Sequence, residues 1–524
     1  MEQVNLFLVD DLHLEGRPIE MQQAFAKQLH EQITNCKTIG NIPVLICAGD
    51  IAEKDAGVEW ASQFDCDIVY ICGNHEFWNN DYYEVIDAIR EKCKQPGYEH
   101  VHFLHNEEVI LHGVRFLGAT LWTELAQSWS WIKRNYVLKH FLSMADFRRI
   151  TARKFYKNSS KVDEMFKFLI KNGVEHDQAT NLIATESFNP FLQIQENAAS
   201  VDFLENKIIE PFEGKTVVVS HHLPIPDFWM KTLGMNENIL TAPYINNKAV
   251  YQEYLKQKIP AEKDILMMGF YVNNFYHFFE HNFAPDIWIH GHFHKEVDSF
   301  IGTTRMASNP VGYMRQSETM NIKKIVIGDE VKNYIDFAID SIENFNWNDK
   351  VNANLSAFKS VIRNFANPIS EEDLKANVFE PILGVFKKQH DKNLKDIEMF
   401  VSGILYNLIK IINKEQTLSD QLYITSYISG FAKFASKYNT KFGIETFIFN
   451  LNENSFLTDA KYKKVTNKLN FGHFTEWIKE IEKIEGQSAV FKKTLIDFFN
   501  HLKTETSLEK IYTEEISIGF SEDE

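Results

Sequence analysis

Short apolar runs, most of them rich in β-branched and aromatic residues, recur through the first part of the chain and lead into polar motifs. They occupy residues 4–9, 44–48, 68–72, 114–117, 216–220 and 287–290. Runs of this length are typical of strands that are buried on both faces, as in parallel sheets. Between two of them, Met21, Phe25, Leu29 and Ile33 repeat every four residues and predict a helix with one apolar face. Strands that alternate with helices predict a layered α/β core.

The alternation of strands and helices is interrupted in one segment and then ends. Residues 124–212 are mostly polar with helical patterns, and we interpret them as a helical insertion over a site at the strand ends. A last strand is predicted at 322–327, and from about residue 332 onward the β pattern nearly vanishes. We therefore predict a main α/β domain over residues 1–335 and an all-α C-terminal domain over residues 350–524, whose amphipathic patterns do not indicate a role.

Charge and apolar content limit the partners of this chain. The net charge is −17 and the pI is near 5.6, which disfavours nucleic acid as a partner, because a double-stranded nucleic acid needs clustered Lys and Arg. A negative protein can still bind phosphate groups through bound cations. The most apolar internal stretch, residues 400–412, is shorter than the roughly 20 residues that span a bilayer, so we expect no membrane segment.

Cysteine usage and the first residues bear on the cellular compartment. The five cysteines all lie early in the sequence and include no C-x-x-C pair. Residues 1–9 lack the basic start, apolar run and small-residue cleavage site of a secretion signal. We therefore expect reduced thiols in a cytoplasmic protein.

Polar motifs stand where five of the predicted strands end. They are Asp11-Leu12-His13, Gly49-Asp50, Gly73-Asn74-His75-Glu76, His221-His222 and Gly291-His292-Phe293-His294. Open α/β sheets present ligand-binding groups at this end of their strands. Asp, Asn and His supply the oxygen and imidazole ligands that suit Mn²⁺, Fe²⁺ or Zn²⁺. Residues i and i+2 of an extended segment point to the same side, so both Asp11 and His13 can reach one cluster, and so can both His292 and His294.

Two further features of these motifs bear on a metal site with two ions. One carboxylate that bridges two cations would hold them about 3.5–4 Å apart, a spacing at which both can contact one phosphoryl group. Asp50 is the candidate bridge. His221 and His222 are adjacent and face opposite ways, so only one of them can be a ligand, and the other could contact the substrate.

The set D-x-H, G-D, G-N-H-E, H-H and G-H-x-H resembles the calcineurin-like metallophosphoesterase superfamily over about residues 1–330 and leaves the C-terminal third unmatched. The resemblance implies a four-layer α-β-β-α sandwich with two divalent metal ions, which we expect to be manganese, with iron, zinc or nickel as alternatives. One ion would be held by Asp11, His13, Asp50 and His294. The other ion would be held by Asp50, Asn74, His221 and His292.

The same resemblance implies roles on the substrate. His75 would face the phosphate, stabilise the transition state and protonate the leaving oxygen. Glu53 is the candidate carboxylate that orients His75. Asn74 and His222 are candidate substrate contacts. The implied reaction is hydrolysis of a phosphomonoester or phosphodiester, of small-molecule or nucleotide type, by in-line attack of a metal-bound hydroxide.

Other segments support or narrow the resemblance. Residues 121–123 (Leu-Trp-Thr) and 309–313 (Asn-Pro-Val-Gly-Tyr) resemble elements of small bacterial members, but they predict no chemistry. Asp10 is an extra carboxylate where relatives usually carry a small residue. The sequence after Asp50 lacks the Tyr of purple acid phosphatases and the Asp-Arg-Gly of serine/threonine protein phosphatases, which argues against both activities.

Two other functions remain open from the sequence. A manganese-dependent nuclease acting with a partner would use residues 350–524 to grip DNA or a protein, and the acidic charge balance argues against it. A non-catalytic, metal-stabilised scaffold would use the same region to bind a protein partner, but a scaffold would not need His75. The C-terminal region could also cap the site or drive self-association, and the sequence does not choose among these roles.

Overall fold

The computed structural model describes residues 3–127, 134–210, 212–232, 262–275, 277–280, 284–301, 303–317 and 319–328. These residues belong to one unit, formed by Met1–Glu237 and Tyr251–Asp329. The predicted helical domain over residues 350–524 lies outside the described residues. That domain, and the boundary near residue 335, therefore stay predictions.

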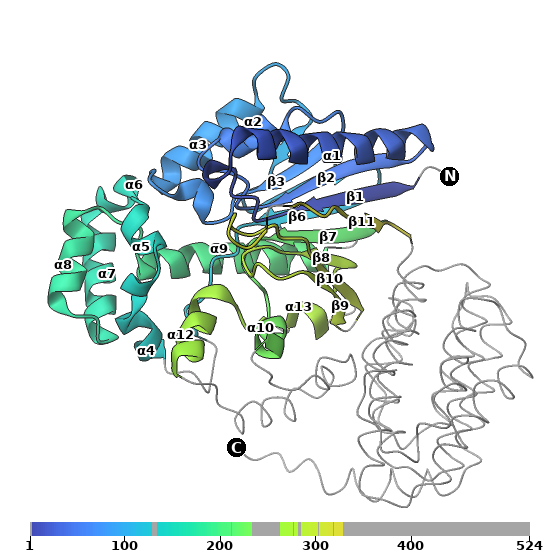
Figure 1. Ribbon diagram of the computed structural model, residues 1–524. Coiled ribbons are helices and arrows are strands. Elements are labelled where there is room, and N and C mark those ends of the chain that lie inside the picture. Colours follow the sequence, from blue (N-terminus) through green and yellow to red (C-terminus); the bar gives the residue numbers. More distant parts are fainter. Residues whose placement is uncertain are drawn as a thin grey trace, which may run out of the picture. The chain divides into compact units, whose positions relative to one another are not determined.

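The first of two sheets has the strand order β11-β1-β2-β3-β4 (Figure 1). Its strands are β1 (Val4–Val9), β2 (Ile42–Ala48), β3 (Asp67–Ile71), β4 (Val101–Phe103) and β11 (Lys323–Val326). The strands β1 to β4 run parallel, and β11 pairs antiparallel with β1. The structure confirms the strands predicted at 4–9, 44–48, 68–72 and 322–327, whereas β4 has no counterpart among the predictions.

The second sheet has the strand order β5-β6-β7-β8-β10-β9. Its strands are β5 (Glu107–Leu111), β6 (Val114–Ala119), β7 (Lys215–Ser220), β8 (Ile287–Ile289), β9 (Val297–Ile301) and β10 (Thr304–Ser308). The four central strands run parallel, and β5 and β9 add antiparallel edges. The strands predicted at 114–117, 216–220 and 287–290 are confirmed, and the two antiparallel edge strands and β10 are not anticipated by the sequence patterns.

The core lies between the two sheets. Alternate residues of each strand, such as Leu6 and Leu8 of β1 and Val217 and Val219 of β7, face into one buried apolar cluster. Each fully buried side chain of this kind stabilises the fold by roughly 1.5–3 kcal/mol relative to exposure. The inward residues meet because side chains alternate between the two faces of a strand. The parallel-rich sheets thereby form one mixed α/β core.

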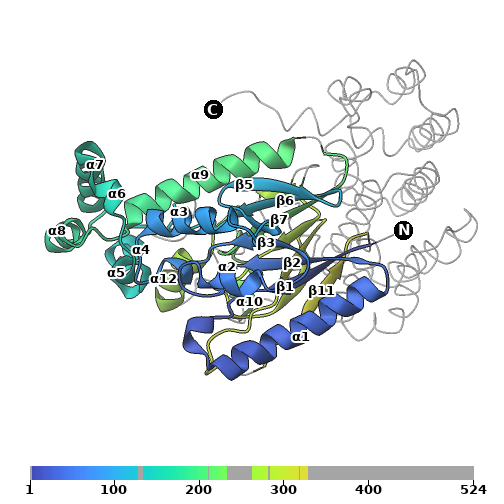
Figure 2. The same cartoon turned by 90° about the horizontal axis from the view of Figure 1, so that it is seen from above.

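Helices cover the outer sides of the two sheets (Figures 1 and 2). The helix α1 (Ile19–Thr38) packs on β2, α3 (Tyr82–Cys93) packs on β4, and α9 (Pro190–Ile209) packs on β6. The short helix α2 (Ala56–Ala61) lies between α1 and α3 in Figure 2. The apolar repeat predicted for the first helix is confirmed, because Phe25, Leu29 and Ile33 are buried. The structure therefore has helices outside both sheets.

The segment between β6 and β7 is helical in its described part. Its helices are α4 (Arg134–Lys139), α5 (Asp146–Arg149), α6 (Arg153–Tyr156), α7 (Ser159–Lys171), α8 (His176–Ala184) and α9. Asn158 and Asn189 accept hydrogen bonds from the first turns of α7 and α9, as N-cap side chains do. The helical character predicted for residues 124–212 is confirmed there. Because α9 packs on β6, this segment supplies part of the helical layer outside the second sheet.

The remaining described helices follow β7 and precede β8. They are α10 (Asp227–Thr232), α12 (Glu262–Tyr271) and α13 (His277–Glu280). Among the described residues, no helix combines the length and the apolar character that crossing a membrane requires. All five cysteines are free thiols, as expected.

Candidate metal centre

The carboxyl ends of five strands bring the sequence motifs together. Asp11 and His13 follow β1, Asp50 follows β2, and Asn74 and His75 follow β3. From the second sheet, His221 follows β7, and His292 and His294 follow β8. All of these side chains except the part-buried His294 are buried. Both sheets therefore contribute to one cluster of acidic, amide and imidazole groups.

One half of the cluster is formed by Asp11, His13 and His294. Their donor atoms lie within 4.8 Å of one another. The Nε2 atoms of His13 and His294 are 3.1 Å apart, and His294 Nε2 is 3.3 Å from Asp11 Oδ1. Asp50 borders this half, because its Oδ2 lies 3.9 Å from His13 Nε2.

The other half is formed by Asp50, His221 and His292, whose donor atoms also lie within 4.8 Å of one another. His221 Nε2 is 3.4 Å from Asp50 Oδ2 and 3.2 Å from Asn74 Oδ1. The same oxygen of Asp50 thus faces both halves, while its Oδ1 accepts a hydrogen bond of 2.8 Å from the backbone N–H of His75. Asp50 therefore lies between the two halves of the cluster.

The environment of these groups fits bound divalent cations. The buried atoms His292 Nε2 and Asp11 Oδ2 have no hydrogen-bond partner, and leaving such groups unpaired costs about 1–3 kcal/mol each. His221 Nδ1 lies 2.9 Å from the Ala48 carbonyl, and His294 Nδ1 lies 2.9 Å from Gln316 Oε1. Nδ1–H donation to these oxygens leaves each Nε2 lone pair directed at the cluster, as in metal-binding histidines.

Backbone conformation at the cluster differs from the expected extended alternation. Asp11, His13, Asp50, His292 and His294 all have positive φ, between 47° and 66°. A left-handed conformation costs roughly 1–2 kcal/mol for a residue with a side chain, and such residues gather at functional sites. The prediction that these motifs are extended is therefore wrong, although their side chains do converge. The side chains converge because of the left-handed turns after the strands and not because of alternation along an extended segment.

Glycine is required where the loops after β2 and β3 touch. Gly49 has φ +89°, and a Cβ there would lie 2.5 Å from His221 Nδ1. A Cβ at Gly73 would collide with Asp50 Oδ1. These two glycines let the Asp50 and Asn74 loops approach each other.

His75 has a partner on each ring nitrogen. Its Nδ1 lies 3.2 Å from Glu15 Oε1, and its Nε2 lies 3.2 Å from the Tyr313 hydroxyl. The Trp78 ring stacks on it with a centroid distance of 3.4 Å. Burial lowers the pKa of His75, but Asp50 and Glu15 outweigh burial and raise it above the ordinary value.

The carboxylate that orients His75 is Glu15 and not Glu53. Glu53 Oε1 accepts hydrogen bonds from Asn79 Nδ2 at 2.9 Å and from Arg149 at 3.4 Å. Glu53, in the turn after β2, therefore points toward Asn79 and Arg149. Glu15 lies in the short helix after His13 and contacts the ring of His75. Burial raises the pKa of Glu15, but hydrogen bonds with His13 and His75 outweigh it and lower the pKa to about 2.

Glu76, quoted in a motif but given no role from the sequence, holds the two loops together. Its Oε2 accepts from the backbone N–H groups of Asp50 at 3.0 Å and Gly73 at 2.7 Å. Its Oε1 accepts from Ile51 N–H and the Tyr70 hydroxyl, both at 3.0 Å. The carboxylate is fully buried. Glu76 therefore fixes the backbone that carries Asp50.

Asp146 is a site residue that no sequence motif indicated. It begins α5 of the inserted segment, and its Oδ1 accepts from Asn74 Nδ2 at 2.9 Å and from Trp78 Nε1 at 2.7 Å. Because the amide nitrogen of Asn74 is engaged, its oxygen is left facing His221. Asp146 thus orients both a predicted ligand and the ring that stacks on His75.

His222 is buried behind the cluster. Its Nδ1 lies 3.2 Å from the Thr120 carbonyl, and its ring is 4.2 Å from that of His292. Burial lowers the pKa of His222 to about 3, so the ring is neutral near pH 7. The contacts favour His221 over His222 as the residue in the cluster. A substrate contact by His222 stays a prediction.

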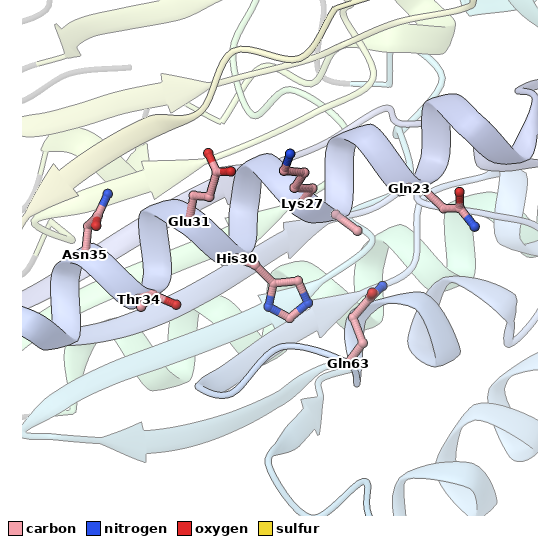
Figure 3. Close-up of a pocket in the computed structure, with 8 residues that line it drawn as sticks. Gln23, Lys27, His30, Glu31, Thr34, Asn35 and Gln63 are labelled. Atoms are coloured by element: carbon pink, nitrogen blue, oxygen red, sulfur yellow. The ribbon is translucent and has the colours of Figure 1, made fainter.

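A separate depression of about 630 Å³ lies along α1, next to Gln63 (Figure 3). It is lined by residues of α1 from Gln23 to Asn35 and by Gln63. Its side chains are mostly polar or charged, and none belongs to the cluster described above.

Comparisons with known proteins identify similarity without defining a family. No family model matches the chain. An uncharacterized protein, L509, of Acanthamoeba polyphaga mimivirus is 24% identical over 267 residues, which cover 48% of this chain and 71% of the viral protein.

Two solved structures are similar at low scores. A phosphopantetheinyl hydrolase from Mycobacterium tuberculosis has a TM-score of 0.35 and 14% identity, covering 62% of this chain and 96% of that protein. A putative 5'-nucleotidase from Staphylococcus aureus, solved with alpha-ketoglutarate, has a TM-score of 0.26 and 11% identity, covering 62% of this chain and 51% of that protein. At these scores neither similarity assigns a family or an activity to this chain.

Proposed function

We propose that this chain is a dinuclear metal-dependent phosphoesterase that hydrolyses a phosphomonoester or phosphodiester of small-molecule or nucleotide type. The supporting observation is the position of Asp50, whose Oδ2 lies 3.9 Å from His13 Nε2 and 3.4 Å from His221 Nε2, between the two donor sets. In this proposal one manganese ion would be held by Asp11, His13, Asp50 and His294. The second ion would be held by Asp50, Asn74, His221 and His292.

Two bound cations would supply positive charge for a phosphoryl group and an activated water. The chain's own contribution centres on His75. Glu15 on Nδ1 favours the doubly protonated ring, so Nε2–H can donate to a phosphoryl oxygen and pass its proton to the leaving oxygen. Stacking on Trp78 fixes the plane of the ring. A scaffold without catalytic activity would not require this arrangement.

The test begins with metal content and hydrolysis. Purified chain loaded with Mn²⁺ should hold about two ions and hydrolyse p-nitrophenyl phosphate or bis-p-nitrophenyl phosphate, and the ratio of the two kcat/KM values separates monoesterase from diesterase activity. Asp50→Ala should lose both metal and activity. His75→Ala should keep its metal and lose activity by about 10²–10⁴-fold.

Matched controls make the outcome decisive. His176→Ala changes an exposed histidine of α8 and should behave as wild type. Equal hydrolysis by wild type and His75→Ala would contradict the proposed role of His75. A fully loaded protein that cleaves neither ester, no nucleotide and no DNA would contradict the proposed activity.

A further inference from the structure

The segment Asn309 to Tyr313 is hydrogen-bonded to the end of β1 and the residues that follow it. Asn309 N–H donates to Asp10 Oδ1 at 2.8 Å, and Asn309 Nδ2 donates to the Leu8 carbonyl at 2.9 Å. The N–H groups of Val311 and Gly312 donate to the carbonyls of Asp10 and Asp11 at 3.2 and 2.9 Å. The unusual carboxylate of Asp10 thus anchors this segment rather than joining the metal cluster.

Arg17 and Gln316 hold the same segment from the other side. The buried guanidinium of Arg17 donates to the carbonyls of Leu12, Gly312 and Ser317. Gly312 has φ +76°, a conformation that favours glycine. Gln316 Oε1 accepts from Tyr313 N–H at 2.6 Å and lies 2.9 Å from His294 Nδ1. These contacts fix the backbone of Tyr313 relative to the cluster.

The Tyr313 side chain reaches the proposed catalytic group. Its ring stacks on His13 with a centroid distance of 4.5 Å and an interplanar angle of 26°. It meets His294 edge-on at 4.8 Å. Its hydroxyl lies 3.2 Å from His75 Nε2, the atom that would face the phosphoryl group. The described contacts of Tyr313 therefore place a phenol directly beside the donor nitrogen.

We propose that the Tyr313 hydroxyl is a second hydrogen-bond donor to the phosphoryl group, beside His75, an inference that rests on the proposed function. His75 has a single hydrogen on Nε2, so when that hydrogen donates to a phosphoryl oxygen, Nε2 has no lone pair left to accept from Tyr313, and the hydrogen of the Tyr313 hydroxyl is free to point at a ligand oxygen. An anion within hydrogen-bond distance of Nε2 is also within reach of a hydroxyl 3.2 Å away. Tyr313 keeps its proton, and the proton for the leaving oxygen comes from His75.

Tyr313→Phe tests this role because it removes the hydroxyl and keeps the ring on His13. The probes are orthovanadate, which mimics the five-coordinate transition state, and inorganic phosphate, each titrated into Mn²⁺-loaded full-length protein. We expect wild-type manganese content and a vanadate affinity that falls about 10-fold to 100-fold, as for a hydrogen bond to a charged group. Tyr98→Phe, which alters a remote half-buried tyrosine, should bind vanadate as wild type.

Kinetics add a second readout. Loss of a donor to a non-bridging oxygen in Tyr313→Phe should lower kcat by a similar factor for p-nitrophenyl phosphate and for phenyl phosphate, which has the poorer leaving group. His75→Ala should instead lose more on phenyl phosphate, because it removes the proton donor for the leaving oxygen.

Several outcomes would overturn the inference. Wild-type vanadate affinity in Tyr313→Phe would exclude a contact between the hydroxyl and the anion. Loss of manganese from the variant would show that the hydroxyl supports the ligand histidines instead. A wild-type protein that loads manganese but binds no vanadate also overturns it. A wild type that binds vanadate through Tyr313 but hydrolyses no ester would overturn the proposed function alone.

Discussion

Burial lowers the pKa of His75, and Asp50 and Glu15 raise it, the latter through a contact of 3.2 Å with Nδ1. Replacing Glu15 with Gln removes a negative charge that raises the pKa of His75, so the protonated ring is lost at lower pH. We therefore expect the basic limb of the kcat–pH profile to move to lower pH, with kcat near pH 7 reduced about tenfold, a part of what general acid catalysis contributes. The measurement is the pH dependence of kcat on p-nitrophenyl phosphate.

The comparison variant is Glu53→Gln, because Glu53 pairs with Asn79 and Arg149. Its basic limb should stay at the wild-type pH. A shifted limb in Glu53→Gln together with an unshifted one in Glu15→Gln would reverse the assignment of the two carboxylates.

The hydrogen bonds of Glu76 lead to a prediction about the stability of the fold. Its two oxygens accept four hydrogen bonds, three of them from backbone N–H groups. In Glu76→Gln an NH₂ group must face some of these donors, so we expect the free energy of unfolding to fall by about 1–3 kcal/mol. Urea denaturation of the metal-free chain measures it. Glu84→Gln, at an exposed ion pair with Arg153, should change stability by about 0.5 kcal/mol or less, and an equal loss in both variants would contradict the role of Glu76.

At the scale of elements, the inserted helices take part in the site through Asp146 of α5. Asp146→Ala frees the Asn74 amide to rotate, because the oxygen that holds Asn74 Nδ2 at 2.9 Å is gone. We expect the affinity for the second manganese ion to fall about 10-fold to 100-fold, as is typical when a group that orients a ligand is removed. Titration of Mn²⁺ followed by electron paramagnetic resonance measures both sites.

Asp146→Asn is the conservative variant, since its amide oxygen can still accept from Asn74 and Trp78, and it should retain most of the affinity. Asp177→Ala, at an exposed position of α8, controls for changes in the insertion itself. Wild-type affinity for both ions in Asp146→Ala would show that Asn74 needs no support from α5.

Most strands that could be predicted from the sequence have residues that are buried along nearly the whole strand. The strand β1 is buried along its whole length, so its apolar run is unmistakable. In β5, residues alternate between half-buried and exposed, and β9 carries the exposed Asp298, so their apolar signal is weak. The strand β4 has only three residues. Edge position and shortness, rather than unusual chemistry, explain these omissions.

At the scale of the whole molecule, the predicted metal ligands converge because each follows the end of a strand. The residues that support these ligands are brought to them only by tertiary contacts. Asp146 and Asn74 are 72 positions apart, and Tyr313 and His75 are 238 apart. Local patterns contain no information on such pairs. The prediction that Glu53 orients His75 failed for the same reason, because Glu15, which does contact His75, lies 60 positions from it and follows another strand.

From the buried carboxylates and histidines of the cluster we also expect bound Mn²⁺ to stabilise the folded chain against unfolding. Asp11 and Asp50 are buried beside five histidines that the unfolded chain would hold apart. Cations that bind only the folded state add roughly 2.7 kcal/mol per site at a concentration 100-fold above Kd. We expect Mn²⁺ to raise Tm by several degrees relative to protein in EDTA, measured by scanning calorimetry.

Asp50→Ala removes the carboxylate that lies between the two donor sets, so its Tm should respond to Mn²⁺ much less than that of wild type, whereas His176→Ala should respond fully. Asp50→Ala also removes a buried charge that contributes to the stability of the metal-free chain. Burial raises the pKa of Asp50, but neighbouring histidines, above all His221, outweigh burial and hold it well below the ordinary value. The comparison must therefore be the metal-induced change in Tm rather than Tm itself. An equal manganese-induced rise in wild type and Asp50→Ala would place the stabilising ions outside this cluster.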